Sequence, residues 1–205
     1  SEANSACMAE RMTDRLTLSQ LQKLKQLKGD KRNLADYAVA VRRVGDAEAI
    51  KVTAIGALST SQVQALRTEH AAVLRSDQIR ALSTEQIQAF ETADLAAMTT
   101  AAVTGLSSSQ VQSLTTAQIK ALQTQHVAAL NSAQVGAITT DQMPAMDVAD
   151  LNALPTARLA GLSTEQIKAL TTAQVDGLAT SQMAALRSDQ LRAMDTRDLA
   201  VLDAS

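Results

Sequence analysis

The sequence offers few residues that could carry out chemistry. Its two histidines are His70 and His126, and its single cysteine is Cys7. Nucleophilic catalysis needs a base beside the nucleophile, and a zinc site needs several Cys, His or acidic ligands held together. Neither histidine has another histidine within five residues or a cysteine nearby. We therefore expect no catalytic residue, no metal site and no bound cofactor.

Nucleotide and nucleic-acid binding are also disfavoured. The seven glycines are scattered and form no Gly-rich phosphate-binding loop. Tyr37 and Phe90 are the only aromatic residues, so platforms on which bases could stack are missing. The formal net charge of −2 opposes general attraction to phosphates. We expect no nucleic-acid partner.

Both histidines belong to an eight-residue repeat. From Ser59 to Leu202 the sequence divides without insertion into eighteen consecutive octads. Position 2 is Ser or Thr in seventeen of the eighteen, position 5 is aliphatic, position 7 is small or Val, and position 8 is Leu, Met, Ile or Phe. Positions 1, 3 and 6 vary. His70 and His126 occupy position 4, where Gln is usual, and we interpret them as polar surface residues.

The octad pattern predicts one short helix per repeat. A hydroxyl at position 2, such as that of Thr116, would accept an unpaired N–H group at the helix start and so cap it. Acidic residues at position 3 would favour a helix N-terminus electrostatically. Positions 5 and 8 supply two aliphatic anchors per octad, such as Ile119 and Leu122. We expect these anchors to form two ladders in the core.

Other arrangements fit the repeat less well. In one continuous helix, eight residues would rotate the apolar stripe by about 80° per octad, so no straight partner could cover it. The apolar spacing averages 4.0 residues rather than the 3.5 of a coiled coil. A β-solenoid is the remaining alternative, but Ala, Leu, Gln and Glu favour helix.

A helix of about six residues is unstable alone, so successive octads must stack. We predict an all-α fold, an α-solenoid forming a right-handed superhelix, in which two octads make one layer. A small residue at position 7 would allow close helix approach. Pro155 at position 1 fits a helix start, whereas Pro144 at position 6 predicts an irregularity between Met143 and Met146.

Some residue types recur seven octads apart. Duplication of a seven-octad unit is the simplest explanation. The alternative is that seven octads form one turn of the superhelix, which would place the recurring side chains on one line. The recurring pairs are His70 with His126, Asp94 with Asp150, and Gly105 with Gly161.

Residues 1–58 differ from the octads. They carry a net charge of +3, against −5 for residues 59–205. We predict an N-terminal helical cap or docking segment of three helices, ending near Gly29, Val44 and the first octad, and a short C-terminal tail at residues 203–205. Solenoids need polar end caps, which favours a structural role. A basic run could instead meet an acidic partner; it consists of Lys23, Lys25, Lys28, Lys31 and Arg32.

The run Leu-Thr-Thr-Ala-Gln-Ile-Lys-Ala-Leu at residues 114–122 resembles octapeptide-repeat regions of large proteobacterial proteins, many of them exported or surface-associated. The resemblance covers the octads from Ser59 to Leu202, which make up most of the chain. It implies the repeat type and an exported or surface location. It assigns no functional residue.

Together these features predict a non-enzymatic repeat protein that acts as a structural spacer or protein-interaction scaffold, with a protein as partner. The alternative is a protein-binding effector or secretion-associated factor that uses variable positions 3 and 6. No apolar run approaches the length that a membrane-spanning helix needs, so we expect no transmembrane segment. The chain starts at Ser1 without an initiator Met, so we expect a processed or partial chain. The sequence indicates no oligomeric state.

Overall fold

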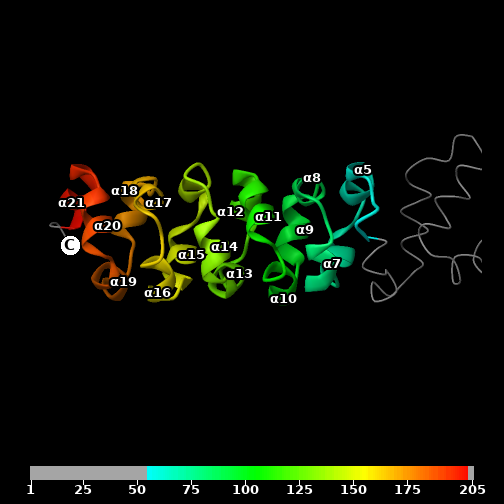
Figure 1. Cartoon of the computed structure of the whole chain (residues 1–205), viewed down its shortest axis with the longest axis horizontal. Helices are drawn as coiled ribbons and strands as arrows, with labels where there is room; N and C mark the ends of the chain where they lie inside the picture. The colour runs from blue at the N-terminus through cyan, green and yellow to red at the C-terminus, as the bar shows by residue number, and fades with distance from the viewer. Residues whose placement is uncertain (1–54, 203–205) are drawn as a thin grey trace, which may run out of the picture.

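The computed structural model describes residues 55–202, and every octad in this range contains one short helix (Figure 1). The described residues contain no strand, so the β-solenoid alternative is wrong. The α-helices are α5 (Thr60–Gln64), α6 (Thr68–Ala71), α7 (Ser76–Arg80), α8 (Thr84–Gln88), α9 (Thr92–Ala97), α10 (Thr100–Val103), α11 (Ser108–Ser113), α12 (Thr116–Ala121), α13 (Thr124–Ala129), α14 (Ser132–Gly136), α15 (Val148–Ala153), α16 (Thr156–Leu159), α17 (Thr164–Lys168), α18 (Thr172–Asp176), α19 (Thr180–Ala185), α20 (Ser188–Ala193) and α21 (Thr196–Leu202).

The predicted N-terminal segment and the tail at residues 203–205 lie outside the described residues, except for residues 55–58. Ile55 and Leu58 are buried. The N–H of Leu58 donates to the carbonyl of Ile55 over 3.2 Å. The same bond joins positions 8 and 5 within the octads, as it does between Leu122 and Ile119. The two residues thus extend the core ladders upstream of Ser59.

Each α-helix begins at position 2, but the residue that caps it is at position 1. In the α12 octad, Thr115 has an extended backbone and its Oγ1 accepts the N–H of Gln118 over 3.2 Å. Thr116 is already the first helical residue, so the predicted cap at position 2 is wrong by one residue. An N-cap residue must keep a non-helical backbone while its oxygen reaches N2 or N3. The same side-chain cap is made by Ser59, Ser83, Thr99, Ser107, Asn131, Thr139, Ser163 and Thr171.

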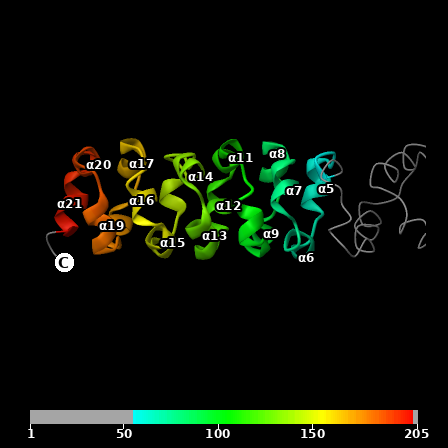
Figure 2. The same ribbon diagram turned by 60° about the horizontal axis from the view of Figure 1, so that its bottom comes forward.

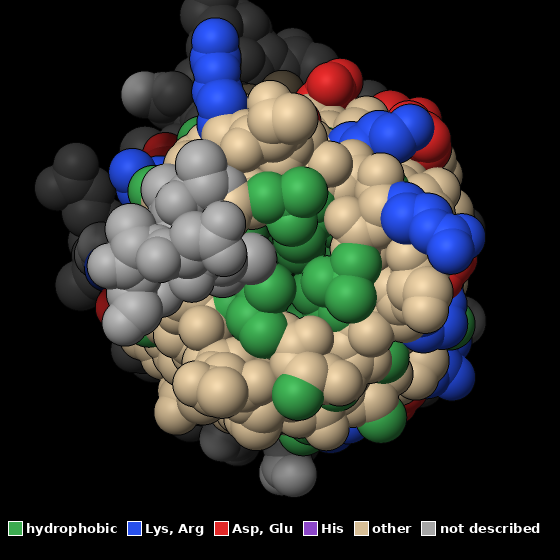
Figure 3. All heavy atoms as spheres, turned by 90° about the vertical axis from the view of Figure 1, so that its left-hand side faces the viewer, with side chains coloured by type: hydrophobic (Ala, Val, Ile, Leu, Met, Phe, Trp, Pro, Cys, Tyr) green, Lys and Arg blue, Asp and Glu red, His purple; other side chains and the backbone are tan. Residues whose placement is uncertain are grey.

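Positions 5 and 8 form the core, as predicted. Ile119 and Leu122 are 2% and 5% exposed, and every position-5 residue from Val63 to Val175 is buried. Viewed onto the C-terminal end, hydrophobic side chains gather near the centre and charged side chains lie toward the rim (Figure 3). The core therefore runs along the solenoid axis.

Octads stack on the third octad along the chain. Helix α6 packs on α9, α13 on α15, and α17 on α20, and the described helices follow one another along the long axis (Figures 1 and 2). Side-chain hydrogen bonds reach 28 and 31 residues back, to the fourth octad. One turn therefore takes three to four octads, and the predicted two-octad layer is wrong. The hand of the superhelix stays a prediction.

The links between helices redirect the chain. In the link between α12 and α13, the residues at positions 8 and 1, Leu122 and Gln123, are extended. With three to four octads per turn, each link redirects the chain by a quarter to a third of a turn, whereas a two-octad layer would need a half turn. Seven octads consequently make about two turns. The alternative that equated seven octads with one turn is wrong.

Small residues and prolines act as expected. A Cβ on Gly105, at position 7, would lie 2.5 Å from the Cα of Ser76, three octads earlier. This contact explains why position 105 carries a glycine. Pro144 lies in a 3-10 helix, Met143–Ala145, where the other octads have an α-helix, which confirms the predicted irregularity. Pro155 is the N-cap residue of α16.

None of the described helices has the length and apolar character needed to cross a membrane.

Candidate functional site

Most polar side chains at position 4 lie inside the solenoid, and three of them, Gln62, His70 and Arg158, are half-buried. Gln118 is 2% exposed and His126 is fully buried. The interpretation of position 4 as a surface site is therefore wrong. Buried polar groups must be hydrogen-bonded, so the partners of this ladder decide what it does.

Gln118 shows how one side chain connects two turns. Its Oε1 accepts the N–H of Thr115 over 3.0 Å, which completes a capping box within its own octad. Its Nε2 donates to the carbonyls of Ile87 over 3.1 Å and Phe90 over 2.9 Å, four octads earlier. The amide thus uses its acceptor and its donors at once, and it joins a helix start to the helix end of the preceding turn.

The same arrangement recurs along the chain. As Gln110 shows, a position-4 glutamine donates to the position-8 carbonyl 28 residues earlier, and most also reach the position-5 carbonyl 31 residues earlier. Residue pairs with the 28-residue spacing are Gln86 with Leu58, Gln110 with Leu82, Gln134 with Leu106, Gln142 with Leu114, Gln166 with Ile138, Gln174 with Met146, Gln182 with Leu154 and Gln190 with Leu162.

His126 replaces a glutamine in this ladder. Its Nδ1 accepts the N–H of Gln123 over 3.2 Å, and its Nε2 lies 2.9 Å from the carbonyl oxygen of Met98. A carbonyl can only accept, so Nε2 carries the proton and the ring is neutral. Burial lowers the pKa of His126. Both ring nitrogens are bound to backbone, which leaves neither for a substrate or a metal ion.

Aspartate fits the ladder less well than glutamine. Asp150 is 3% exposed and its Oδ1 accepts the hydroxyl of Thr124 over 2.8 Å. An ionised carboxylate has no proton to donate to the carbonyls of Ile119 and Leu122, which a glutamine would reach. Burial raises the pKa of Asp150.

Asp94 lies in the corresponding place seven octads earlier. It is 2% exposed, and its Oδ2 is buried without a hydrogen-bond partner. Burial raises its pKa as well, while a hydrogen bond from Thr68 acts against this rise. These two carboxyls and His126 do not combine into a metal site, because residues 55–202 contain no group of three or more His, Cys, Asp or Glu that could hold an ion.

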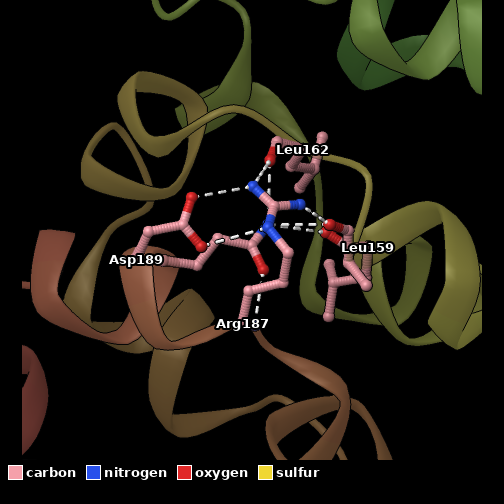
Figure 4. A network of polar contacts seen from close by, with 6 residues as sticks. Leu159, Leu162, Arg187 and Asp189 are labelled. Atoms are coloured by element: carbon pink, nitrogen blue, oxygen red, sulfur yellow. Dashed lines mark hydrogen bonds and ion pairs between the residues drawn. The ribbon is translucent and has the colours of Figure 1, made fainter.

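Position 3 is exposed in all eighteen octads, which places variable side chains on the outside. Acidic residues there pair with an arginine two residues earlier in several octads. The guanidinium of Arg187 binds the carboxylate of Asp189 through Nε over 3.0 Å and Nη2 over 3.1 Å (Figure 4). It also donates to the carbonyls of Ala160 and Leu162 in the preceding turn. Arg187 and Gln190 therefore donate hydrogen bonds to the same two carbonyls.

One open groove lies beside the irregular octad at Met143–Ala145. It has a volume of about 570 Å³ and is lined largely by hydroxyl and amide side chains. These side chains belong to octads on adjacent turns: Ser108, Ser109, Gln112, Thr139, Thr140 and Ser163. The groove contains no charged residue among those that line it.

Three stretches of the chain match one family. The family is the ALTTAQ repeat, and the matches cover residues 87–124, 116–148 and 143–180. The chain is similar to ALTTAQ repeats. The matches start at residues 87, 116 and 143, so each begins about one turn of the solenoid after the last. The predicted resemblance to a repeat region is confirmed. No curated protein is similar enough to the whole chain to count as a match.

The sequence could have revealed the position-4 ladder. Gln occurs at position 4 in eleven of the eighteen octads, although position 6 changes freely. A polar residue of one type at a fixed place indicates a fixed partner, since a solvated site would accept Lys or Glu equally well. In these octads that partner is the backbone of the preceding turn.

Proposed function

We propose that the chain is a non-enzymatic repeat protein that acts as a structural spacer or protein-interaction scaffold in a bacterial exported or surface protein. One observation carries this proposal: the buried glutamines of the octads, and His126, bind backbone groups of their own solenoid. The side-chain amide of Gln118, for example, is hydrogen-bonded to the N–H of Thr115 and to the carbonyls of Ile87 and Phe90. The variable residues face solvent.

The spacer role is supported by the way in which added octads lengthen the solenoid. Each octad meets its neighbours three and four octads away through the same positions, so octads can be inserted or removed without a new type of contact. A spacer needs this tolerance to change in length. It also needs rigidity, which cross-turn hydrogen bonds such as that from Gln166 to Ile138 provide.

The second candidate is a protein-binding effector or secretion-associated factor that uses positions 3 and 6. The exposure of position 3 in every octad favours it, because side chains free of packing can vary to suit a partner. The groove lined by Ser108 and Thr139 is a further candidate contact.

Removal of seven octads, residues 107–162, tests the two candidates. The cut joins octad Thr99–Leu106 to octad Ser163–Leu170 in register and removes about two turns. A spacer keeps its helical circular dichroism spectrum and its attachment to the protein or surface that carries it. A binder loses a partner that the full chain captures. Replacement of position-3 residues in the same octads, without deletion, is the matched variant, because it changes the outer surface and leaves the length intact.

The location is tested by fractionating the source bacterium. Detection of the chain in the culture medium or on intact cells supports the exported or surface assignment. Recovery only from the cytosolic fraction contradicts that part of the proposal and leaves the spacer and scaffold roles to the deletion experiment.

A further inference from the structure

The open groove beside the irregular octad at Met143–Ala145 has the size of a small-ligand site. Its volume is about 570 Å³. Gly136, an exposed residue at position 6, helps to open it. A Cβ added to Gly136 would have no heavy atom within 4 Å, whereas a Cβ on Gly105 would meet backbone. The absence of a side chain at Gly136 therefore leaves room that a ligand can fill.

Two hydrogen-bonding groups that are paired elsewhere in the solenoid are unpaired in this groove. The position-6 amides of Gln88 and Asn152 donate to the position-7 carbonyl 25 residues later, and the distance from Gln88 to Ser113 is 2.7 Å. Gln112 also occupies position 6, but its side-chain amide makes no hydrogen bond with the described residues. The carbonyl of Ala137, 25 residues after Gln112, accepts no hydrogen bond from them either. Both residues line the groove.

The groove also offers hydroxyl groups with unused protons. The side-chain oxygens of Thr139 and Ser163 accept the backbone N–H groups of Gln142 and Gln166, over 3.2 and 3.1 Å. Neither hydroxyl donates its own proton to a described residue. Thr140 is exposed and its hydroxyl is bonded to none of the described residues. A hydroxyl can donate once and accept twice, so these groups have hydrogen-bonding capacity left for a ligand.

We propose that this groove, formed around Gln112, Gly136, Ala137, Thr140 and Ser163, binds a neutral saccharide. The hydroxyls of a saccharide both donate and accept. They can accept from the Gln112 amide and the Ser163 hydroxyl, and they can donate to the Ala137 carbonyl. None of the lining residues is charged, so an ionised ligand would lose hydration without gaining a partner. The inference goes beyond the proposed function, since it holds for a spacer and for a scaffold.

A protein segment suits the groove less well than a saccharide. Hot spots of protein interfaces are mostly Trp, Tyr or Arg side chains that fill well-packed pockets. The large hydrophobic residues that the described chain exposes are Val73, Leu191 and Leu199, and none of them lines the groove. Ile138 lines it but is only 3% exposed. The groove thus supplies hydrogen-bonding groups and neither an apolar anchor point nor an acidic partner for Arg.

The test is an NMR titration of the full chain with three neutral trisaccharides: maltotriose, cellotriose and triacetylchitotriose. Trigalacturonate is the charged control ligand of matched size. We expect at least one neutral trisaccharide to shift the side-chain amide signals of Gln112 and the backbone amide signals of Gly136 and Thr140. Trigalacturonate should leave these signals unchanged. Hexaglycine tests a neutral polypeptide as the occupant, and it should also leave them unchanged.

Variants of the chain locate the site. Gly136→Leu fills the groove, and the fold should survive because a Cβ at this residue meets nothing, which circular dichroism checks. It should weaken trisaccharide binding about tenfold or more. Ala184→Leu is the matched control, because it also places leucine at an exposed position 6, outside the groove, and its binding should be unchanged. Gln112→Leu removes one hydrogen-bonding group and should weaken binding about threefold or more.

Three results overturn the proposal. The first is that no neutral trisaccharide shifts the signals of Gln112, Gly136 and Thr140, even near the limit of its solubility. The second is equal trisaccharide affinity of the Gly136→Leu and Ala184→Leu chains, because it would place binding elsewhere. The third is tighter binding of trigalacturonate or hexaglycine than of every neutral trisaccharide, because it would show that the groove selects a charged ligand or a polypeptide.

Discussion

The Nε2 atom of Gln118 lies 2.9 Å from the carbonyl oxygen of Phe90, 28 residues earlier in the chain. This contact joins the start of one octad helix to the end of another on the preceding turn. Its repetition at eight other position-4 glutamines ties the short helices, which have no stability alone, into one solenoid. The ladder is also where the chain departs from its own pattern, at Asp94, His126 and Asp150.

The position of the helix cap is tested by a neighbouring pair of threonines. Thr115→Ala removes the hydroxyl that accepts the N–H of Gln118, so it should lower the free energy of unfolding by about 1 kcal/mol. Thr116→Ala changes an exposed first helical residue and should alter it by less than about 0.5 kcal/mol. Urea denaturation measures both. A larger change in the free energy of unfolding for Thr116→Ala than for Thr115→Ala would show that the helix cap is at position 2.

The core ladder is tested at Leu122, which is 5% exposed at position 8. Leu122→Ala should cost about 2 to 5 kcal/mol of unfolding free energy, because a buried leucine leaves a cavity. Leu199→Ala, at an exposed position 5, should cost much less and serves as the control. Similar costs at both sites would show that the interior is not packed as described.

Asp150→Gln should stabilise the protein at neutral pH. Glutamine can donate to the carbonyls of Ile119 and Leu122, and it removes a buried carboxylate, so we expect a gain of about 1 to 3 kcal/mol in the free energy of unfolding. Asp176→Gln, at an exposed position, is the control.

The gain from Asp150→Gln should also depend on pH. Burial raises the pKa of Asp150 in the folded chain, so the folded state holds its proton more tightly than the unfolded state does. Stability of the unmodified chain therefore falls as pH rises from the ordinary aspartate pKa through the raised one. The advantage of the variant should shrink when both proteins are compared near pH 4. An advantage that stays constant with pH would exclude this carboxylate as its source.

His126 should make the protein sensitive to mild acid. Its pKa is lowered in the folded chain, because burial opposes the charged ring. As pH falls below the ordinary histidine pKa of about 6.5, the unfolded state takes up a proton that the folded state resists, and stability decreases. The protonated Nδ1 would also lose its bond from the N–H of Gln123.

His126→Gln removes this effect, because glutamine supplies the same acceptor and donor without titrating near pH 6. Thermal unfolding at pH 7.5 and pH 5 should show a smaller loss of stability for the variant than for the unmodified chain. An equal loss in both proteins would show that other groups cause the acid sensitivity.

Much of this fold follows from local patterns. The spacing of Ile119 and Leu122 predicts a helix and its buried face, since apolar residues three apart share one side of a helix. The position of Pro144 predicts the break in regular helix, because proline lacks the N–H that the helix needs. These features depend on residues within one octad.

What the sequence did not reveal depends on residues three to four octads apart. Whether Gln118 is buried is decided by the preceding turn, and the number of octads per turn depends on how far residues such as Leu122 and Gln123 redirect the chain. The cap was misplaced because Thr115 and Thr116 are both hydroxyl residues. Only the backbone geometry at each residue separates them.

The central claim is that position-4 side chains hold successive turns together, and Gln118→Leu tests it most directly. Leucine is of similar size but leaves the N–H of Thr115 and the carbonyl of Phe90 without their side-chain partner. Its free energy of unfolding should fall by about 1 to 3 kcal/mol. Gln112→Leu, at exposed position 6 of the preceding octad, should change it by less than about 0.5 kcal/mol. Equal effects of the two variants in urea denaturation would contradict the account.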